Sequence, residues 1–263
     1  MARQTIFDAE AEFTVPDWAA AWYLPWRDPG RSVWRAVRAQ PGQAGAVAAG
    51  LNARTTPAAP VRFVPAHALP PGEAYEAFIA RERAVPTRDN GHDAFNGLVW
   101  LRLPCSKARL NAIQSAEIAR AGVGGARGAV RDAATLFDEN ALLLHAPDAL
   151  WDALAARRWR DVFGRLRPLW DAACVLVFGH AALEKLVRPY KAITCHVWRV
   201  APAFDPAGDL SALDTWLARD LTAEKLALKP FAALPVLGIP GWWSTNENAA
   251  FYDDTEVFRA PRR

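Results

Sequence analysis

The sequence predicts a single-domain α+β protein in which helices flank a small, mainly antiparallel sheet. Three observations predict this class. Apolar residues recur at helical spacing, short runs alternate as strands do, and turn-forming residues separate these segments. The 263 residues are 52% hydrophobic and 22% charged, which is a globular balance. We expect one domain, with an irregular part over residues 1–85 and a core over residues 86–263.

The first part of the chain is rich in aromatic residues and interrupted by prolines. To about Arg38 we expect an irregular wrap with brief helices, pinned by its tryptophan side chains. Residues 61–64 alternate as a strand does, and residues 73–83 have the apolar side of a helix. Residues 86–91 form a turn by composition.

Two helices and a hairpin are predicted next. Residues 92–103 carry an apolar stripe at helical spacing, and Pro104 ends this helix. Ser106 caps a second helix over residues 107–121. The polar triplet at residues 138–140 lies between two short apolar runs, which predicts a β-hairpin.

The remaining elements alternate in type. Residues 174–178 are too short an apolar run to distinguish a strand from the start of a helix. The other predictions are a helix over residues 148–163, a helix over 180–187, a strand over 193–200, a helix over 210–221 and a turn-rich tail over 235–261 that docks on the core.

Composition limits the function classes. The net charge of +3 is too small to indicate nucleic acid as a partner. Five arginines between residues 157 and 167 suit the solvated face of a helix, and an anionic partner is the alternative. Three cysteines without C-x-x-C spacing indicate neither a disulfide framework nor a structural zinc site.

Targeting signals are missing from the sequence. No apolar stretch approaches the roughly 20 residues of a membrane span. Residues 1–13 lack the basic start and apolar run of a signal peptide. We therefore expect a cytoplasmic protein without a membrane partner.

Four sequence blocks together resemble the bacterial family catalogued as domain of unknown function 3025. They are Asn90 to Asn96 with Trp100 and Pro104; Arg131-Asp132 with Thr135 to Glu139; Phe178 to Ala181 with Glu184-Lys185; and Leu237 to Trp243 with Asn246-Glu247 and Phe251 to Asp254. The combination is specific and covers most of the chain. Gly91 departs from it, since the family favours Trp there. The resemblance implies a cytoplasmic bacterial protein and no established activity.

Two pairs of polar residues at helical spacing are candidate site residues. His92 and Asn96 share a helix face, and Asp93 lies in the first turn, where a carboxylate is favoured. His92 is either a packed helix-start residue or a general base or metal ligand oriented by a carboxylate. His180 and Glu184 have the spacing to share a metal ion, and equally that of an ordinary hydrogen bond.

Further candidates surround the predicted hairpin. Asp132, Asp138 or Glu139 joins the two histidines around a divalent ion such as zinc, manganese or iron, or serves turn chemistry alone. Arg131 is a candidate binding residue or the ion-pair partner of Asp132. Lys107 starts the second helix, where an anion would be favoured, and a solvated basic face is the alternative.

These residues support two hypotheses. The first is a hydrolase, metal-dependent or acid–base, with His92, Asp93, Asp132 and His180 as catalytic residues and His92, His180, Glu184 and Asp138 as metal ligands. Asn96, Lys107 and Arg131 would bind substrate. The second is a non-catalytic binding protein in which the same groups form a hydrogen-bond network. Convergence of both histidines and a carboxylate at one accessible point favours the hydrolase.

Overall fold

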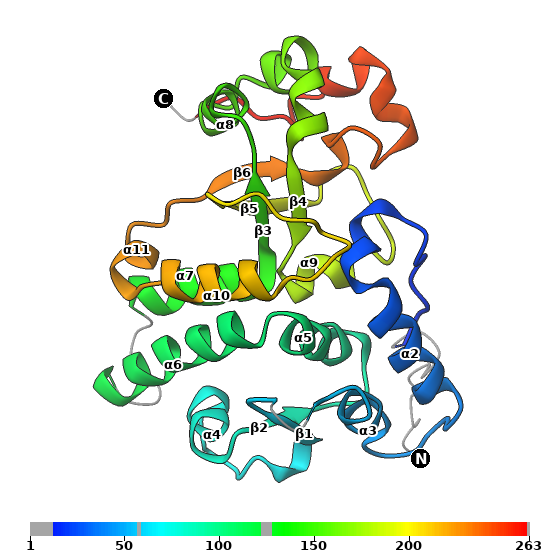
Figure 1. The fold of residues 1–263 in the computed structure, drawn as a ribbon, viewed down its shortest axis with the longest axis vertical. Helices are drawn as coiled ribbons and strands as arrows, with labels where there is room; N and C mark the ends of the chain where they lie inside the picture. Colours follow the sequence, from blue (N-terminus) through cyan, green and yellow to red (C-terminus); the bar gives the residue numbers. More distant parts are fainter. Residues whose placement is uncertain (1–12, 57–58, 122–127, 262–263) are drawn as a thin grey trace, which may run out of the picture.

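The computed structural model describes residues 13–56, 59–121 and 128–261. Helices dominate, and two small sheets lie among them, so the α+β class is confirmed. Figure 1 shows the larger sheet in the upper half of the molecule, a band of helices across the middle, and the smaller sheet below. Most of residues 1–13, for which no signal peptide is expected, lie outside the described ranges.

The larger sheet has the strand order β4-β3-β5-β6. Strand β3 (Ala141–His145) pairs antiparallel with β4 (Cys174–Val177) and parallel with β5 (Thr194–Arg199), and β5 pairs antiparallel with β6 (Ala232–Pro235). Two of these three pairings are antiparallel, as predicted. The central strand β3 is apolar and almost fully buried because it is paired on both edges.

The smaller sheet joins β1 (Arg62–Pro65) to β2 (Ala84–Thr87) in parallel, so the fold is mixed rather than mainly antiparallel throughout. Strand β2 contains Pro86 and Thr87, which were predicted to start a turn. Proline is tolerated here because β2 is an edge strand. The chain turns only after Thr87.

The predicted hairpin around residues 138–140 is wrong. Asp138 lies in the last turn of helix α7 (Ala129–Asn140), and β3 follows the helix directly. Ala133, Ala134 and Phe137 are buried at helical spacing, and this pattern outweighed the short apolar run that suggested a strand.

The other helices surround the two sheets. They are α2 (Arg27–Arg38), α3 (Ala46–Asn52), α4 (Tyr75–Glu82), α5 (Gly91–Arg102), α6 (Pro104–Ala121), α8 (Asp148–Ala155), α9 (His180–Lys185), α10 (Ser211–Asp220) and α11 (Ala223–Ala227), with short helical turns η1 (Ala21–Trp26), η2 (Ala66–Ala68), η3 (Asp161–Arg165), η4 (Arg167–Ala172), η5 (Val236–Gly238), η6 (Ser244–Glu247) and η7 (Ala249–Asp253).

Two predicted helix boundaries are corrected. Pro104 follows the end of α5, but it is also the first residue of α6, where its fixed φ suits the helix, so Ser106 lies inside α6 and does not cap it. The helix predicted from Asp148 to Phe163 ends at Ala155, and Arg157 then has a φ of 51°. The arginines that follow therefore do not share one continuous helical face.

The N-terminal wrap is pinned by aromatic side chains, as predicted, although α2 is longer than a brief helix. Tyr23 stacks on Phe95 of α5 at a centroid distance of 5.9 Å, and its hydroxyl donates to the carbonyl of Leu183 in α9. Trp34 packs against Phe95 from α2. The wrap thus fixes α5 and α9 relative to each other.

The ends of the described chain lie on the surface of the same core. The C-terminal turns pack through Tyr252 and Phe258 onto Phe163, and Phe251 packs against both of these rings, which confirms a docked tail. Within the described ranges, no helix is long and apolar enough to cross a membrane.

Candidate functional site

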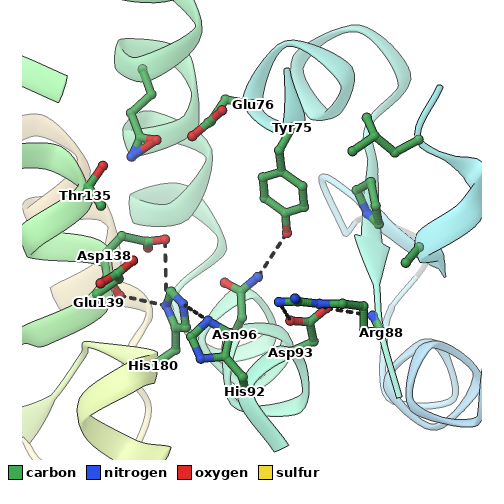
Figure 2. Close-up of a pocket in the computed structure, with 14 residues that line it drawn as sticks. Tyr75, Glu76, Arg88, His92, Asp93, Asn96, Thr135, Asp138, Glu139 and His180 are labelled. Carbon is green, nitrogen blue, oxygen red and sulfur yellow. Dashed lines mark hydrogen bonds and ion pairs between the residues drawn. The ribbon is translucent and has the colours of Figure 1, made fainter. Parts of the chain in front are cut away.

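A pocket of about 440 Å³ opens where α5, α7 and α9 meet α4 and β2 (Figure 2). Most of its lining residues are polar or charged. The lining residues are Ala66, Leu69, Tyr75, Glu76, Pro86, Arg88, His92, Asp93, Asn96, Gln114, Thr135, Asp138, Glu139 and His180. Segments that are distant in sequence thus converge on one accessible hollow.

The start of α5 presents three of the predicted residues. The side chain of Asn90 accepts a hydrogen bond from the Asp93 backbone N–H at 2.8 Å, which caps the helix. One turn separates His92 from Asn96, so both face the pocket. Asp93 faces it beside them.

The two imidazoles are in direct contact. His92 Nε2 lies 3.0 Å from His180 Nε2, with the rings nearly perpendicular at 80°. Behind them, His92 Nδ1 lies 2.8 Å from Glu184 Oε2, and His180 Nδ1 lies 2.8 Å from the backbone carbonyl of Asp138. A chain of four groups therefore runs from Glu184 through both rings to α7.

The end acceptors of this chain fix how many hydrogens the two rings carry, and the lowered pKa of His180 assigns the hydrogen they share. A backbone carbonyl only accepts, so His180 Nδ1 carries a hydrogen, and in the neutral ring Nε2 is a bare acceptor. The contact between the rings needs one hydrogen, and because burial lowers the pKa of His180 to about 4, that hydrogen is assigned to His92 Nε2. Because Glu184 also accepts, His92 is protonated at both nitrogens and is an imidazolium ion.

The environment of each ring agrees with this assignment. The hydrogen bond to Glu184 raises the pKa of His92 above its ordinary value of 6.5. Burial lowers the pKa of His180 to about 4, which keeps it neutral at pH 7. Two adjacent histidines thus have pKa values displaced in opposite directions, as in an acid–base pair.

A glycine allows His180 to approach α7. A Cβ at Gly179 would lie 2.4 Å from the carbonyl oxygen of Glu139 and 2.5 Å from the backbone nitrogen of Asn140. Only glycine permits this distance between α9 and the end of α7. The Phe178-Gly179-His180 block therefore has a geometric reason for its glycine.

A buried lysine organises the pocket floor. Lys107 is 4% exposed, and its Nζ donates to Asp138 Oδ1 at 2.5 Å and to Asn96 Oδ1 at 2.7 Å. Asn96 donates in turn to the hydroxyl of Tyr75 at 3.1 Å. Lys107 lowers the pKa of Asp138 against the opposing effect of burial, and Asp138 stays ionised.

Asp93 is fully engaged by Arg88. Its two carboxylate oxygens accept from the Arg88 backbone N–H at 2.6 Å and from the guanidinium at 2.8 and 3.2 Å. Among the described residues, the Asp93 carboxylate makes hydrogen bonds to Arg88 and none to His92. Its predicted role in orienting His92 stays a prediction. Its negative charge still contributes to the raised pKa of His92.

The predicted site residues divide into three groups. His92, Asp93, Asn96, Asp138 and His180 line the pocket, whereas Glu184 and Lys107 support it from behind. Neither Arg131 nor Asp132 lines it, and Asp132 is exposed on another face of α7.

Five further polar lining residues were not predicted as site residues: Tyr75, Glu76, Arg88, Gln114 and Thr135. One clue was available. Lys107 and Gln114 are two helical turns apart, on the face of α6 that also contains the buried Leu110. Polar residues on a buried helix face indicate a site or a network.

The proposed metal ligands do not surround one point. Glu184 and Asp138 contact the Nδ1 sides of the rings, and the two Nε2 atoms face each other. In the part of the chain that the structure describes, no group of three or more His, Cys, Asp or Glu residues is arranged to hold a metal ion. Metal binding therefore stays a prediction.

Most of the chain matches one protein family. Residues 61–262 match the model of a family described as protein of unknown function (DUF3025). No curated protein and no solved structure matches the chain. The matched range includes all of the residues that line the pocket.

Proposed function

The chain belongs to the DUF3025 family, whose description assigns no function, and we propose from its pocket that it is an acid–base hydrolase of the bacterial cytoplasm. The observation that carries the proposal is the 3.0 Å contact between His92 Nε2 and His180 Nε2 in the pocket wall. It couples a protonated ring to a neutral ring, which are the acid and the base that hydrolysis needs.

In the proposed reaction the substrate separates the two rings. His180 Nε2 accepts a proton from a water molecule, and the resulting hydroxide attacks the electrophilic carbon of the substrate. His92 Nε2 donates its proton to the leaving group as the bond breaks. Glu184 holds the His92 ring in place, and the carbonyl of Asp138 holds the tautomer of His180.

The direct contact between the rings would then restore the starting protonation of both histidines. After one turnover His180 is protonated and His92 is neutral. Once the products leave, the rings return to contact, and the proton passes from His180 Nε2 to His92 Nε2. Since His92 has the higher pKa, this transfer is downhill. No proton from bulk solvent is required.

The pocket suits a small substrate. Its volume of about 440 Å³ falls within the range of small-molecule sites. His180 is 5% exposed, so its Nε2 would act in a poorly hydrated environment, whereas His92 is more open. A buried base, His180, beside a more accessible acid, His92, supports proton transfer to and from a bound substrate.

The proton assignment can be tested directly by long-range ¹H–¹⁵N NMR of the histidine rings. At pH 7 we expect His180 with hydrogen on Nδ1 and a bare Nε2, and His92 with both nitrogens protonated. His180→Gln and His92→Gln variants assign the signals. A neutral His180 with hydrogen on Nε2 would contradict the proposal, because its base would then lack a free lone pair.

Activity provides the second test. Wild-type protein, purified without an affinity tag, is assayed on a panel of chromogenic esters and fluorogenic aminoacyl amides. We expect hydrolysis that both His→Gln variants lose, with rates that fall when His180 is protonated or His92 is deprotonated. A parallel assay with added zinc, manganese or iron tests the metal-dependent form. Activity found only with a metal would replace the proton-transfer mechanism.

The alternative is a non-catalytic binding protein. The observation in its favour is that Asp93, Arg88, Lys107 and Asp138 satisfy one another as a structural network does. If the His→Gln variants lose stability and the wild type hydrolyses nothing on the panel, this alternative is the better explanation.

A further inference from the structure

Most charges in the pocket are paired. Arg88 pairs with Asp93, Lys107 with Asp138, and the His92 imidazolium with Glu184. Two lining carboxylates, Glu76 and Glu139, are left over, and neither side chain contacts a cation in the described residues. Among the described residues, these two carboxylates therefore have no ion-pair partner.

A buried amide in the same pocket has no hydrogen-bond partner in the part of the chain that the structure describes. Gln114 is only 7% exposed, and its side chain makes no hydrogen bond to any described residue. A buried amide without partners is costly, and native proteins usually avoid it. Its polar atoms are not sealed in the core, because Gln114 lines the hollow. Its donor and acceptor face the hollow, so both are available to a polar group of a bound ligand.

These residues form one wall, which we call the unpaired wall: Glu76, Gln114, Thr135 and Glu139. Thr135 adds a hydroxyl whose hydrogen-bonding capacity is also unused in the described residues. In Figure 2, Glu76, Thr135 and Glu139 lie on the side away from Arg88. The wall offers two carboxylates and an amide oxygen as acceptors, and an amide and a hydroxyl as donors.

The opposite side of the pocket offers donors. The Tyr75 hydroxyl accepts from Asn96, and its own hydrogen has no acceptor among the described residues. Arg88 uses its Nε and Nη2 atoms on Asp93 and leaves Nη1 free of such a bond. A carbonyl oxygen at one end of a ligand could accept hydrogen bonds from these groups. The other end of the ligand would then lie near the carboxylates of Glu76 and Glu139.

We propose that the pocket takes a small basic amide or ester, with an ammonium or guanidinium group held by Glu76 and Glu139 and a carbonyl near the histidine pair. This inference rests on the proposed hydrolase function for the fate of the carbonyl group. The positive group of the ligand pairs with the two carboxylates of the unpaired wall, and the side chain of Gln114 makes a further hydrogen bond to the ligand.

Binding is tested by calorimetry with two probes of equal shape, Nα-acetyl-L-arginine amide and Nα-acetyl-L-citrulline amide (arginine amide and citrulline amide below). Acetylation removes the α-ammonium group from both, so that they differ only in a guanidinium and a neutral urea. We expect the arginine compound to bind about tenfold more tightly, as a charge-assisted hydrogen bond predicts. Its affinity should fall as sodium chloride is raised. Equal affinities, or no saturable binding of arginine amide below about 10 mM, would overturn the proposal.

Variants locate the interaction. The double variant Glu76→Gln/Glu139→Gln should lose the preference for arginine amide, and it should fold because both carboxylates lack partners in the described residues. The control Asp152→Asn/Asp171→Asn removes the same charge from exposed positions outside the pocket and should keep the preference. A preference that survives in the first variant, or is lost in the control, counts against the unpaired wall.

A third variant separates this inference from the proposed function. His180→Gln removes the proposed base but leaves the unpaired wall intact, so arginine amide should bind as it does to the wild type. If binding is retained while the NMR experiment contradicts the proton assignment, the hydrolase proposal fails and the binding site stands. If the proton assignment holds and the probes bind equally, only the inference about the ligand fails.

Discussion

Lys107 and Asp138 form a buried ion pair that ties α6 to α7, with Lys107 Nζ 2.5 Å from Asp138 Oδ1. The lysine side chain is 5% exposed, and that of Asp138 is 21% exposed. The same Asp138 presents its backbone carbonyl to His180. The ion pair therefore fixes the turn of α7 that sets the tautomer of the proposed base.

Replacing Lys107 alone should be strongly destabilising. In Lys107→Met the Asp138 carboxylate and the Asn96 oxygen lose their donor, and we expect a loss of about 3 kcal/mol in the free energy of unfolding. The double variant Lys107→Met/Asp138→Asn should recover part of this loss, because no buried charge is left alone. Urea denaturation measures both. Arg120→Met, which breaks an exposed ion pair, is the control and should unfold as the wild type does. Similar losses for both lysine variants would contradict this account.

The carboxylate behind His92 controls its protonation. In Glu184→Gln the ring keeps a hydrogen-bonding neighbour but loses the negative charge, so the pKa of His92 should fall. NMR titration of the ring measures the change. Glu247→Gln, in the distant turn η6, removes the same charge from Arg167 and should leave the pKa of His92 as it is. An unchanged pKa in Glu184→Gln would mean that Glu184 does not stabilise the imidazolium.

Local patterns in the sequence were sufficient for the helices that carry the histidines. The apolar stripe of α5 and the glycine before α9 predict where His92 and His180 lie within their own helices. Helical spacing also predicts that Asn96 shares the face of His92. These relations depend on residues at most a few positions apart, which sequence periodicity reports.

Contacts between segments could not be predicted in the same way. His180 and Glu184 were expected to act together, but each contacts His92, which is about 90 residues away in sequence. Tyr75, Arg88 and Gln114 join the pocket only because α4, β2 and α6 pack around α5. No local pattern encodes that packing.

The start of α6 is a second case in which a contact between distant segments was not predicted. Ser106 was expected to cap this helix, but the N-terminal backbone groups are satisfied by Asp214 of α10. Asp214 accepts from the N–H groups of Cys105 and Ser106, both at 2.8 Å, and from the Ser106 hydroxyl at 2.6 Å. The cap is thus supplied from about 108 positions away.

Removing this long-range cap should destabilise the protein. Asp214 is 3% exposed, so Asp214→Ala leaves the buried N–H group of Ser106 and the N–H group of Cys105 without this acceptor, and we expect a loss of about 2 kcal/mol. Ser106→Ala removes only the hydroxyl contact and should cost about 1 kcal/mol. Thermal and urea unfolding measure both changes. If Ser106→Ala proves the more damaging of the two, the capping role of Asp214 is wrong.

His180 should make the stability of the protein fall in mild acid. Its pKa is about 4 in the folded protein, against an ordinary value of 6.5. Well above pH 6.5, His180 is neutral in both the folded and the unfolded state, so it does not change the free energy of unfolding. Between pH 6.5 and 4, His180 binds a proton in the unfolded state but not in the folded state. The free energy of unfolding therefore decreases as the pH falls, by about 3 kcal/mol in total.

The His180→Gln variant isolates this contribution. Its amide can still donate to the Asp138 carbonyl, but it does not titrate, so its free energy of unfolding should depend less on pH between 6.5 and 4 than that of the wild type. His92 does not obscure the comparison. Its raised pKa gives a contribution that is fully present below pH 6.5 and is lost only as the pH rises through the folded value. Urea denaturation at half-unit pH intervals measures the two curves. Parallel curves would show that His180 is not held neutral by burial, and the proposed base would then be protonated in the range where it is needed.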